Sequence, residues 1–402
     1  MKCLFTFIGS LLLGTQSLGN TATLLGPDLE PVWVEIRTIS PEWIRLDNSP
    51  GDAMVLKPEQ VLRLTLNNRA VSTPDEDHAV LTLRDGQVLV GTLVASNDDE
   101  AVRLKLDANR AVQVPLDEML SLAIKQSAKT PAVDEDDALL LATGEVLTGF
   151  VETFTKDAVG FVVGDADDAI EIPMQRIQAL SIANKPRPVE AKAGMLRVTT
   201  TEGSVLLIED ATLTPSAPDE PAGVLVGVSS LPILASRRSD EGVSTAASSQ
   251  LTLPMERVVT IEPVSTKVSL TSLSKMEWDV VDGGEVFGVA MPPRVAPEGA
   301  IHLHAPVTLG FDVPKGVRRL AFTAAMDLDK NVPEVRRAMA GCELIVYDGD
   351  NAVARHTLTP DGSAKRLNVP LTGDLRIALE PGVNGPVLDR VVLTQAELLV
   401  SE

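Results

Sequence analysis

Aromatic side chains are scarce in this 402-residue chain: they make up 3% of it, with three tryptophans and one tyrosine. Ligands that stack on aromatic rings, sugars above all, therefore have few positions to use. Histidine is also rare, with four residues, so any acid–base catalysis would have to rely on carboxylates. No stretch after the N-terminus reaches the roughly 18 apolar residues expected of a membrane-spanning helix.

Cysteine is nearly absent, with only Cys3 and Cys342. Residues 1–19 predict a secretory signal peptide, because Lys2 provides a positive start and Leu4–Leu13 an apolar core that is too short to span a bilayer. Cys3 would leave with that peptide. The mature chain would then have no intramolecular disulfide and no cysteine zinc site. We expect an exported protein, located in the periplasm, at the cell surface or outside the cell.

The chain has a large excess of acidic residues, with a formal charge of −21 and a pI near 4.6. This charge repels phosphate backbones and anionic lipids, so nucleic acid is not an expected partner. The sequence contains no Gly-x-Ser-x-Gly elbow, His-Glu-x-x-His motif or phosphate-binding glycine loop. We therefore do not expect an enzyme.

A repeat occupies the first two thirds of the chain. Residues 78–124 align with residues 137–183 without gaps between their landmarks. Three landmarks recur 58 residues later, as Gly86 and Gly144, Gly91 and Gly149, and Pro115 and Pro173. Each copy predicts five short strands with one helical turn before the last, a pattern typical of a small SH3- or Sm-like β-barrel.

The segments beside these two copies look like altered versions of the same unit. Residues 28–66 predict a degenerate copy without its first hairpin. Residues 194–263 predict a copy with a long polar loop insertion, whose loop-like parts are residues 214–223 and 236–250. Neither a basic nor an aromatic stripe marks a binding face, so spacing and contacts with other exported proteins are the favoured roles.

Residues 264–402 follow a different pattern, with longer strands. Between Gly299 and Asp329, apolar residues alternate in three runs, each of which buries one face of a strand. Eight or so strands and no long helix predict a jelly-roll β-sandwich. The whole chain is thus expected to be all-β, with tandem SH3/Sm-like barrels followed by this sandwich.

The C-terminal third resembles the NPCBM family (novel putative carbohydrate-binding module), which has a galactose-binding-like sandwich fold. The order and spacing of six segments carry the resemblance: Ser269–Leu273, Gly299–His304, Met326–Asp329, Val346–Gly349, Gly373–Leu375 and Asp389–Ala396. Leu393 stands where the family has tryptophan. The resemblance implies a module that binds a polysaccharide or cell-surface glycan, and five residues are the candidates for that contact: Trp278, His304, Asp327, Tyr347 and Asp389.

Metal binding has two candidate groups. Asp327 and Asp329 flank one residue on a turn, where carboxylates could join a calcium site of the kind found in galactose-binding-like sandwiches, or could simply be solvated. His302 and His304 share one strand face, but no third ligand lies near them in sequence. A hydrogen-bonded structural role is the favoured interpretation of these histidines, and no other cofactor is expected.

Three functions follow, in order of preference. The first is an exported, non-enzymatic carbohydrate-binding or glycan-associated protein. The second is a secreted or periplasmic scaffold whose β-modules mediate protein–protein contacts. The third is a glycoside hydrolase or its accessory, since paired acids far apart in sequence leave no local motif.

Overall fold

The computed structural model describes residues 20–401, except 50–51, 68, 73–77, 97–99, 108–109, 126–127, 134, 165, 167, 215–222, 240–241, 266, 298 and 330. The proposed signal peptide lies outside the described residues. The described chain is almost entirely β, which confirms the predicted fold class, and its single α-helix is the four-residue α1 (Glu334–Arg337). No helix in this part of the chain is long and apolar enough to cross a membrane. The chain divides into two compact units, an upstream unit and a C-terminal sandwich.

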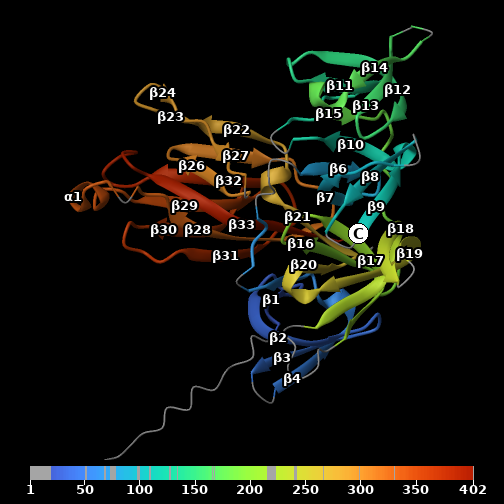
Figure 1. Ribbon diagram of the computed structural model, residues 1–402. Coiled ribbons are helices and arrows are strands. Elements are labelled where there is room, and N and C mark those ends of the chain that lie inside the picture. The colour runs from blue at the N-terminus through green and yellow to red at the C-terminus, as the bar shows by residue number, and fades with distance from the viewer. Residues whose placement is uncertain are drawn as a thin grey trace, which may run out of the picture. The chain divides into compact units, whose positions relative to one another are not determined.

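The upstream unit contains four successive modules of five strands each, coloured from blue to yellow in Figure 1. Module 1 consists of β1 (Thr21–Leu25), β2 (Pro31–Ile39), β3 (Ile44–Ser49), β4 (Asp52–Leu56) and β5 (Arg63–Leu66). Module 2 consists of β6 (Ala79–Leu83), β7 (Val88–Leu93), β8 (Ala101–Lys105), β9 (Arg110–Pro115) and β10 (Met119–Ala123). Module 3 consists of β11 (Asp137–Leu141), β12 (Val146–Phe154), β13 (Ala158–Val163), β14 (Ile170–Pro173) and β15 (Ile177–Ser181). Module 4 consists of β16 (Leu196–Thr200), β17 (Val205–Thr214), β18 (Val224–Ser239), β19 (Gly242–Pro254) and β20 (Val258–Pro263).

The modules share one topology. A 3₁₀ turn precedes the fifth strand in each, for example η2 (Leu116–Glu118) before β10. The fifth strand then pairs with the first, as β10 does with β6, β15 with β11 and β20 with β16. Fifth strands also pair between modules, β10 with β15 and β5 with β20. Because a proline ends the fourth strand in modules 2 to 4, the chain turns at the same point in each.

Two predictions for the flanking modules are wrong. Module 1 has a complete first hairpin, because β1 begins upstream of residue 28 and pairs with both β2 and β5. Residues 236–239 and 242–250 are not a loop: they belong to the β18–β19 hairpin, where Ser236 pairs with Thr245. Small and β-branched residues such as these are compatible with an extended ladder even where the composition is polar. The SH3/Sm-like name for the modules stays a prediction.

The C-terminal unit is a sandwich of two antiparallel sheets, shown in orange and red in Figure 1. Sheet 1 contains, in spatial order, β25 (Arg294–Val295), β26 (Ile301–His304), β33 (Arg390–Ser401), β28 (Val317–Met326) and β31 (Lys365–Pro370), with β21 (Val268–Ser272) paired to β33. Sheet 2 contains β22 (Trp278–Gly283), β27 (Val307–Phe311), β32 (Leu375–Pro381), β29 (Cys342–Asp348) and β30 (Asn351–Leu358). A small hairpin is formed by β23 (Glu285–Val286) and β24 (Val289–Ala290).

The alternating runs predicted between residues 299 and 329 form β26, β27 and β28. Ile301 and Leu303 of β26, with Leu309 of β27 and Phe322 of β28, lie in one buried core between the sheets. Residues in between face outward, because successive side chains of a strand point to opposite faces. This alternation leaves His302 and His304 on the outer face of sheet 1.

Two short upstream segments, residues 25–31 and 59–62, belong to the sandwich unit. Leu25, Leu29 and Leu62 form a small buried cluster with Ala321 and Leu399 of sheet 1. These leucines cover apolar surface of the sheet that residues 264–402 alone would leave exposed. The sandwich as a folding unit is therefore larger than its contiguous sequence.

Candidate functional site

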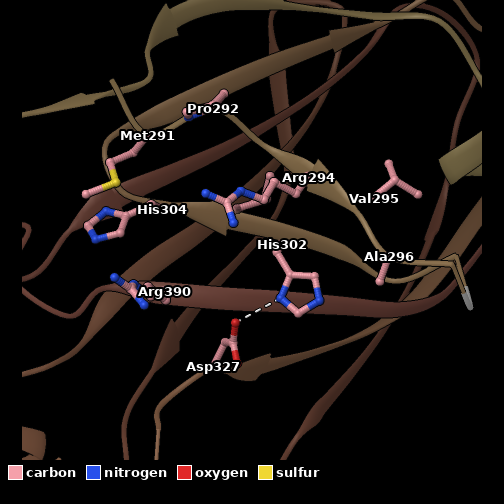
Figure 2. Close-up of a pocket in the computed structure, with 10 residues that line it drawn as sticks. Met291, Pro292, Arg294, Val295, Ala296, His302, His304, Asp327 and Arg390 are labelled. Atoms are coloured by element: carbon pink, nitrogen blue, oxygen red, sulfur yellow. Dashed lines mark hydrogen bonds and ion pairs between the residues drawn. The ribbon is translucent and has the colours of Figure 1, made fainter. Parts of the chain in front are cut away.

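A pocket of about 400 Å³ lies on the outer face of sheet 1, at the end where β25, β26 and β33 run side by side (Figure 2). Strand register builds its floor. His302 of β26 is directly opposite Arg294 of β25, and His304 is directly opposite Arg390 of β33. Directly paired residues point to the same side of a sheet. The four side chains therefore share one face, and the loop before β25 adds a wall made of Met291 and Pro292.

Two hydrogen bonds orient the histidines. His302 Nδ1 lies 2.8 Å from Asp327 Oδ2, and His304 Nδ1 lies 2.8 Å from the carbonyl oxygen of Ala305. A carbonyl can only accept, so the Nδ1 of His304 carries the proton, and its Nε2 offers a lone pair in the neutral ring. Asp327 stands at the end of β28, next to Arg390, whose carbonyl accepts a bond from the Asp327 N–H (2.8 Å). The pocket thus presents fixed polar groups beside a small apolar wall.

Arg294 and Arg390 were not among the residues expected from sequence. Arg294 follows two prolines on a strand of only two residues, and Arg390 adjoins the buried Asp389. Arg294 belongs to no recognisable motif, and Arg390 stands at an unspecified position of the Asp389–Ala396 segment. Only the pairing of both flanking strands with β26 reveals that the two guanidinium groups reach the same pocket.

Of the five candidates from sequence, His304 and Asp327 line the pocket. Trp278 does not, because it lies in sheet 2 opposite Phe311 and packs against the core. Tyr347 is also in sheet 2, where the Arg376 guanidinium carbon lies 5.4 Å from the centre of its ring. The structure therefore does not place an aromatic platform beside the two polar candidates.

Asp389 is fully buried and joins two loops. Its carboxylate accepts bonds from the N–H groups of Gly341 (2.8 Å) and Gly382 (3.0 Å). Burial, and then the negative charge of Asp389, raises the pKa of the neighbouring Cys342 thiol to about 12. These contacts explain Asp389 as a structural residue.

The suggested calcium ligands are used differently. Asp327 pairs with His302, and Asp329 accepts a bond from the Asn331 N–H (2.8 Å) within its turn. Among the described residues, no group of three or more His, Cys, Asp or Glu side chains could hold a metal. A calcium ion needs six or more oxygen ligands, which these two carboxylates do not supply.

Module 1 carries a second, smaller groove of about 260 Å³ beside Trp33. Trp33 is 69% exposed, more than the other two tryptophans, Trp43 and Trp278. Arg37 forms ion pairs with Glu35 (2.7 Å) and Asp47 (2.6 Å) in the floor of this groove. Because its charged groups already have partners, the groove has fewer free polar contacts to offer than the sandwich pocket.

No family model matches the sequence. No curated protein matches it either. Among solved structures, the chain is similar to a CBM51 module from Clostridium perfringens GH95 in complex with methyl-galactose. The two sequences are 18% identical, the match covers 32% of this chain and 99% of that module, and the TM-score is 0.25. Tandem CBM51 modules of a family 98 glycoside hydrolase from Streptococcus pneumoniae SP3-BS71 give 12% identity, 95% and 88% coverage and a TM-score of 0.26.

The CBM51-2 and INT domains of Clostridium perfringens ZmpB give 12% identity, and the chain covers 40% of their length with a TM-score of 0.26. These neighbours are carbohydrate-binding modules. At such TM-scores, the similarity assigns no function to this chain.

Proposed function

We propose that this is an exported, non-catalytic glycan-binding protein whose sandwich holds a saccharide in the pocket on sheet 1. One observation carries the proposal: register brings His302, His304, Arg294 and Arg390 to one cavity, which Asp327 also lines. A cavity of this size is typical of small-molecule sites, which measure about 300–1,000 Å³. Fixed donors and acceptors beside an apolar wall suit a sugar, which combines hydroxyl groups with a C–H face.

The pocket supports binding better than hydrolysis. Glycosidases of the usual type need two carboxyl groups, about 5–10 Å apart, one on each side of the scissile bond. Among the described lining residues only Asp327 is acidic, and it is paired with His302. A hydrolase at this site would have no second acid among the described lining residues.

The first test is a glycan array probed with the purified full chain and two variants. His304→Ala removes a group that lines the pocket, and Trp33→Ala removes the exposed ring of module 1. We expect saccharide binding that His304→Ala abolishes and Trp33→Ala retains. Binding that depends on Trp33 and not on His304 would move the site to module 1, and a folded chain that binds no saccharide would overturn the proposal.

A scaffold function is the second candidate, and module 3 favours it. Val146 and Phe150, both on one face of β12, are 48% and 53% exposed. Exposed apolar neighbours of this kind mark protein contacts. If this face binds an exported protein, Phe150→Ser should release the partner from the full chain while His304→Ala should not; retention of the partner by Phe150→Ser would exclude this face.

A further inference from the structure

We infer that the ligand of the sheet 1 pocket is an acidic saccharide, with a carboxylate or sulfate group held between Arg294 and Arg390. The inference rests on the proposed function and adds the chemical class of the sugar. Figure 2 shows the Arg294 side chain extending between His302 and His304, with Arg390 beside His304 on the neighbouring strand.

The register explains how two arginines from different strands can serve one ligand. β25 and β33 flank β26, so Arg294 and Arg390 start two strands apart, about 10 Å across the sheet. They are also offset by two residues along β26, about 7 Å. Arginine side chains are long enough to approach a group at the centre of this diagonal from both sides. The planar guanidinium forms paired hydrogen bonds with carboxylate and sulfate-like oxygens.

The charges of the pocket are not balanced from within. Neither Arg294 nor Arg390 has an acidic partner among the residues that the structure describes, and the only described carboxylate of the lining, Asp327, is bonded to His302. Two other arginines of the sandwich have acidic partners, Arg355 with Glu343 (2.6 Å) and Arg376 with Asp350 (2.9 Å). Two guanidinium groups against one carboxylate leave a local positive charge.

This local charge contrasts with the chain as a whole, whose formal charge is −21. Long polyanions would be repelled by the net charge of the chain, whereas a short acidic saccharide can enter the cationic pocket. Both arginines also stand directly opposite histidines. A histidine ring carries no negative charge and so does not balance the arginine opposite it, whereas an anion between the two guanidinium groups would do so.

The remaining contacts suit the rest of a sugar ring. The Nδ1–H of His304 donates to the Ala305 carbonyl, so Nε2 of the neutral ring can accept a hydrogen bond from a sugar hydroxyl. Met291 and Pro292 supply the apolar wall against which the C–H face can pack. Recognition through charge and an aliphatic wall does not require a Trp, Tyr or Phe platform, which the described lining of the pocket does not contain.

The test is calorimetric titration of the full chain with matched saccharides. Trigalacturonate is compared with its methyl ester, which has the same skeleton without charge, and galactose 6-sulfate is compared with galactose. We expect at least one acidic probe to bind at least 30-fold more tightly than its neutral counterpart; which one does so separates carboxylate from sulfate. Arg294→Gln and Arg390→Gln should each weaken that binding about 10- to 100-fold.

Arg355→Gln is the matched control, because it removes a paired arginine of the same sandwich and should leave binding unchanged. If neutral and acidic probes bind equally and His304→Ala abolishes both, the inference fails and the proposed function stands. If acidic probes still bind when both arginines are replaced, the anion is held elsewhere and the inference also fails. If no probe binds to the folded chain, the inference is overturned, and the array described above then decides the proposed function independently.

Discussion

Replacing Leu29 with alanine should destabilise the C-terminal sandwich, although this residue lies more than 230 positions upstream of residue 264. Leu29 is fully buried in the cluster that residues 25–31 form on sheet 1. Its φ of +58° is left-handed, a conformation that costs a leucine about 1–2 kcal/mol. Burial of the side chain must outweigh that cost, so truncating the side chain should lower the free energy of unfolding substantially.

The expected loss follows from the burial. Truncating a buried leucine to alanine removes its transfer free energy and leaves a cavity, at a cost of about 2–5 kcal/mol. We expect about 3 kcal/mol, because a short surface segment can relax into part of the space. For a unit of roughly 150 residues, this corresponds to a fall in Tm of about 6–12 °C.

The assay has to report on the sandwich alone, because a chain of two units need not unfold in one step. Trp33 and Trp43 belong to the upstream unit and Trp278 to the sandwich. In a background with Trp33→Phe and Trp43→Phe, tryptophan fluorescence during urea unfolding reports on Trp278. The transition of this background is compared with and without Leu29→Ala.

Val383→Ala in the same background is the control, because Val383 belongs to the sandwich and its side chain is fully exposed. Val383→Ala should change the free energy of unfolding of the sandwich by less than about 0.5 kcal/mol. If Leu29→Ala changes it no more than this control does, residues 25–31 do not stabilise the sandwich and the reasoning is refuted.

Three further predictions concern buried and half-buried groups. Asp389→Asn should lower the free energy of unfolding of the sandwich by about 2 kcal/mol, because one buried N–H loses its acceptor; an unchanged Trp278 transition would contradict this. Because burial and the charge of Asp389 raise the pKa of Cys342 to about 12, the thiol stays neutral at pH 8, and iodoacetamide should label it only after unfolding; rapid labelling of the native chain would show that the thiol is accessible. Arg257→Met should cost the upstream unit about 1 kcal/mol at pH 7 and less at pH 3, measured by circular dichroism. Burial opposes ionisation of Glu202, but the hydrogen bond from Arg257 (2.9 Å) prevails and holds the pKa of Glu202 below the usual value. The pair therefore stabilises the fold above the pKa that Glu202 has in the unfolded chain, and this stabilisation is lost as the pH falls through its pKa in the folded chain. A cost of Arg257→Met that does not depend on pH would argue against this pair.

The sequence by itself determined the all-β class and the surface that each strand of the sandwich core buries. Ile301 and Leu303 alternate with His302 and His304, and period-two alternation assigns the two pairs to opposite faces whatever the partner strands are. The outward direction of His304 was therefore available from a short stretch of sequence. Leu393, which stands where the resembled family has tryptophan, is fully buried in sheet 1, so that difference lies in the core.

The composition of the site depended on information that no local pattern contains. Arg294 meets His302, and Arg390 meets His304, only because β26 lies between β25 and β33 in one particular register. Trp278, an attractive candidate by residue type, faces the core because it pairs with Phe311 in the other sheet. Alternation along a strand is a local property of the backbone, whereas the partner of a strand is chosen by contacts between distant segments. For this reason the sequence could indicate a β-sandwich, and only the tertiary structure could show which charges meet on its surface.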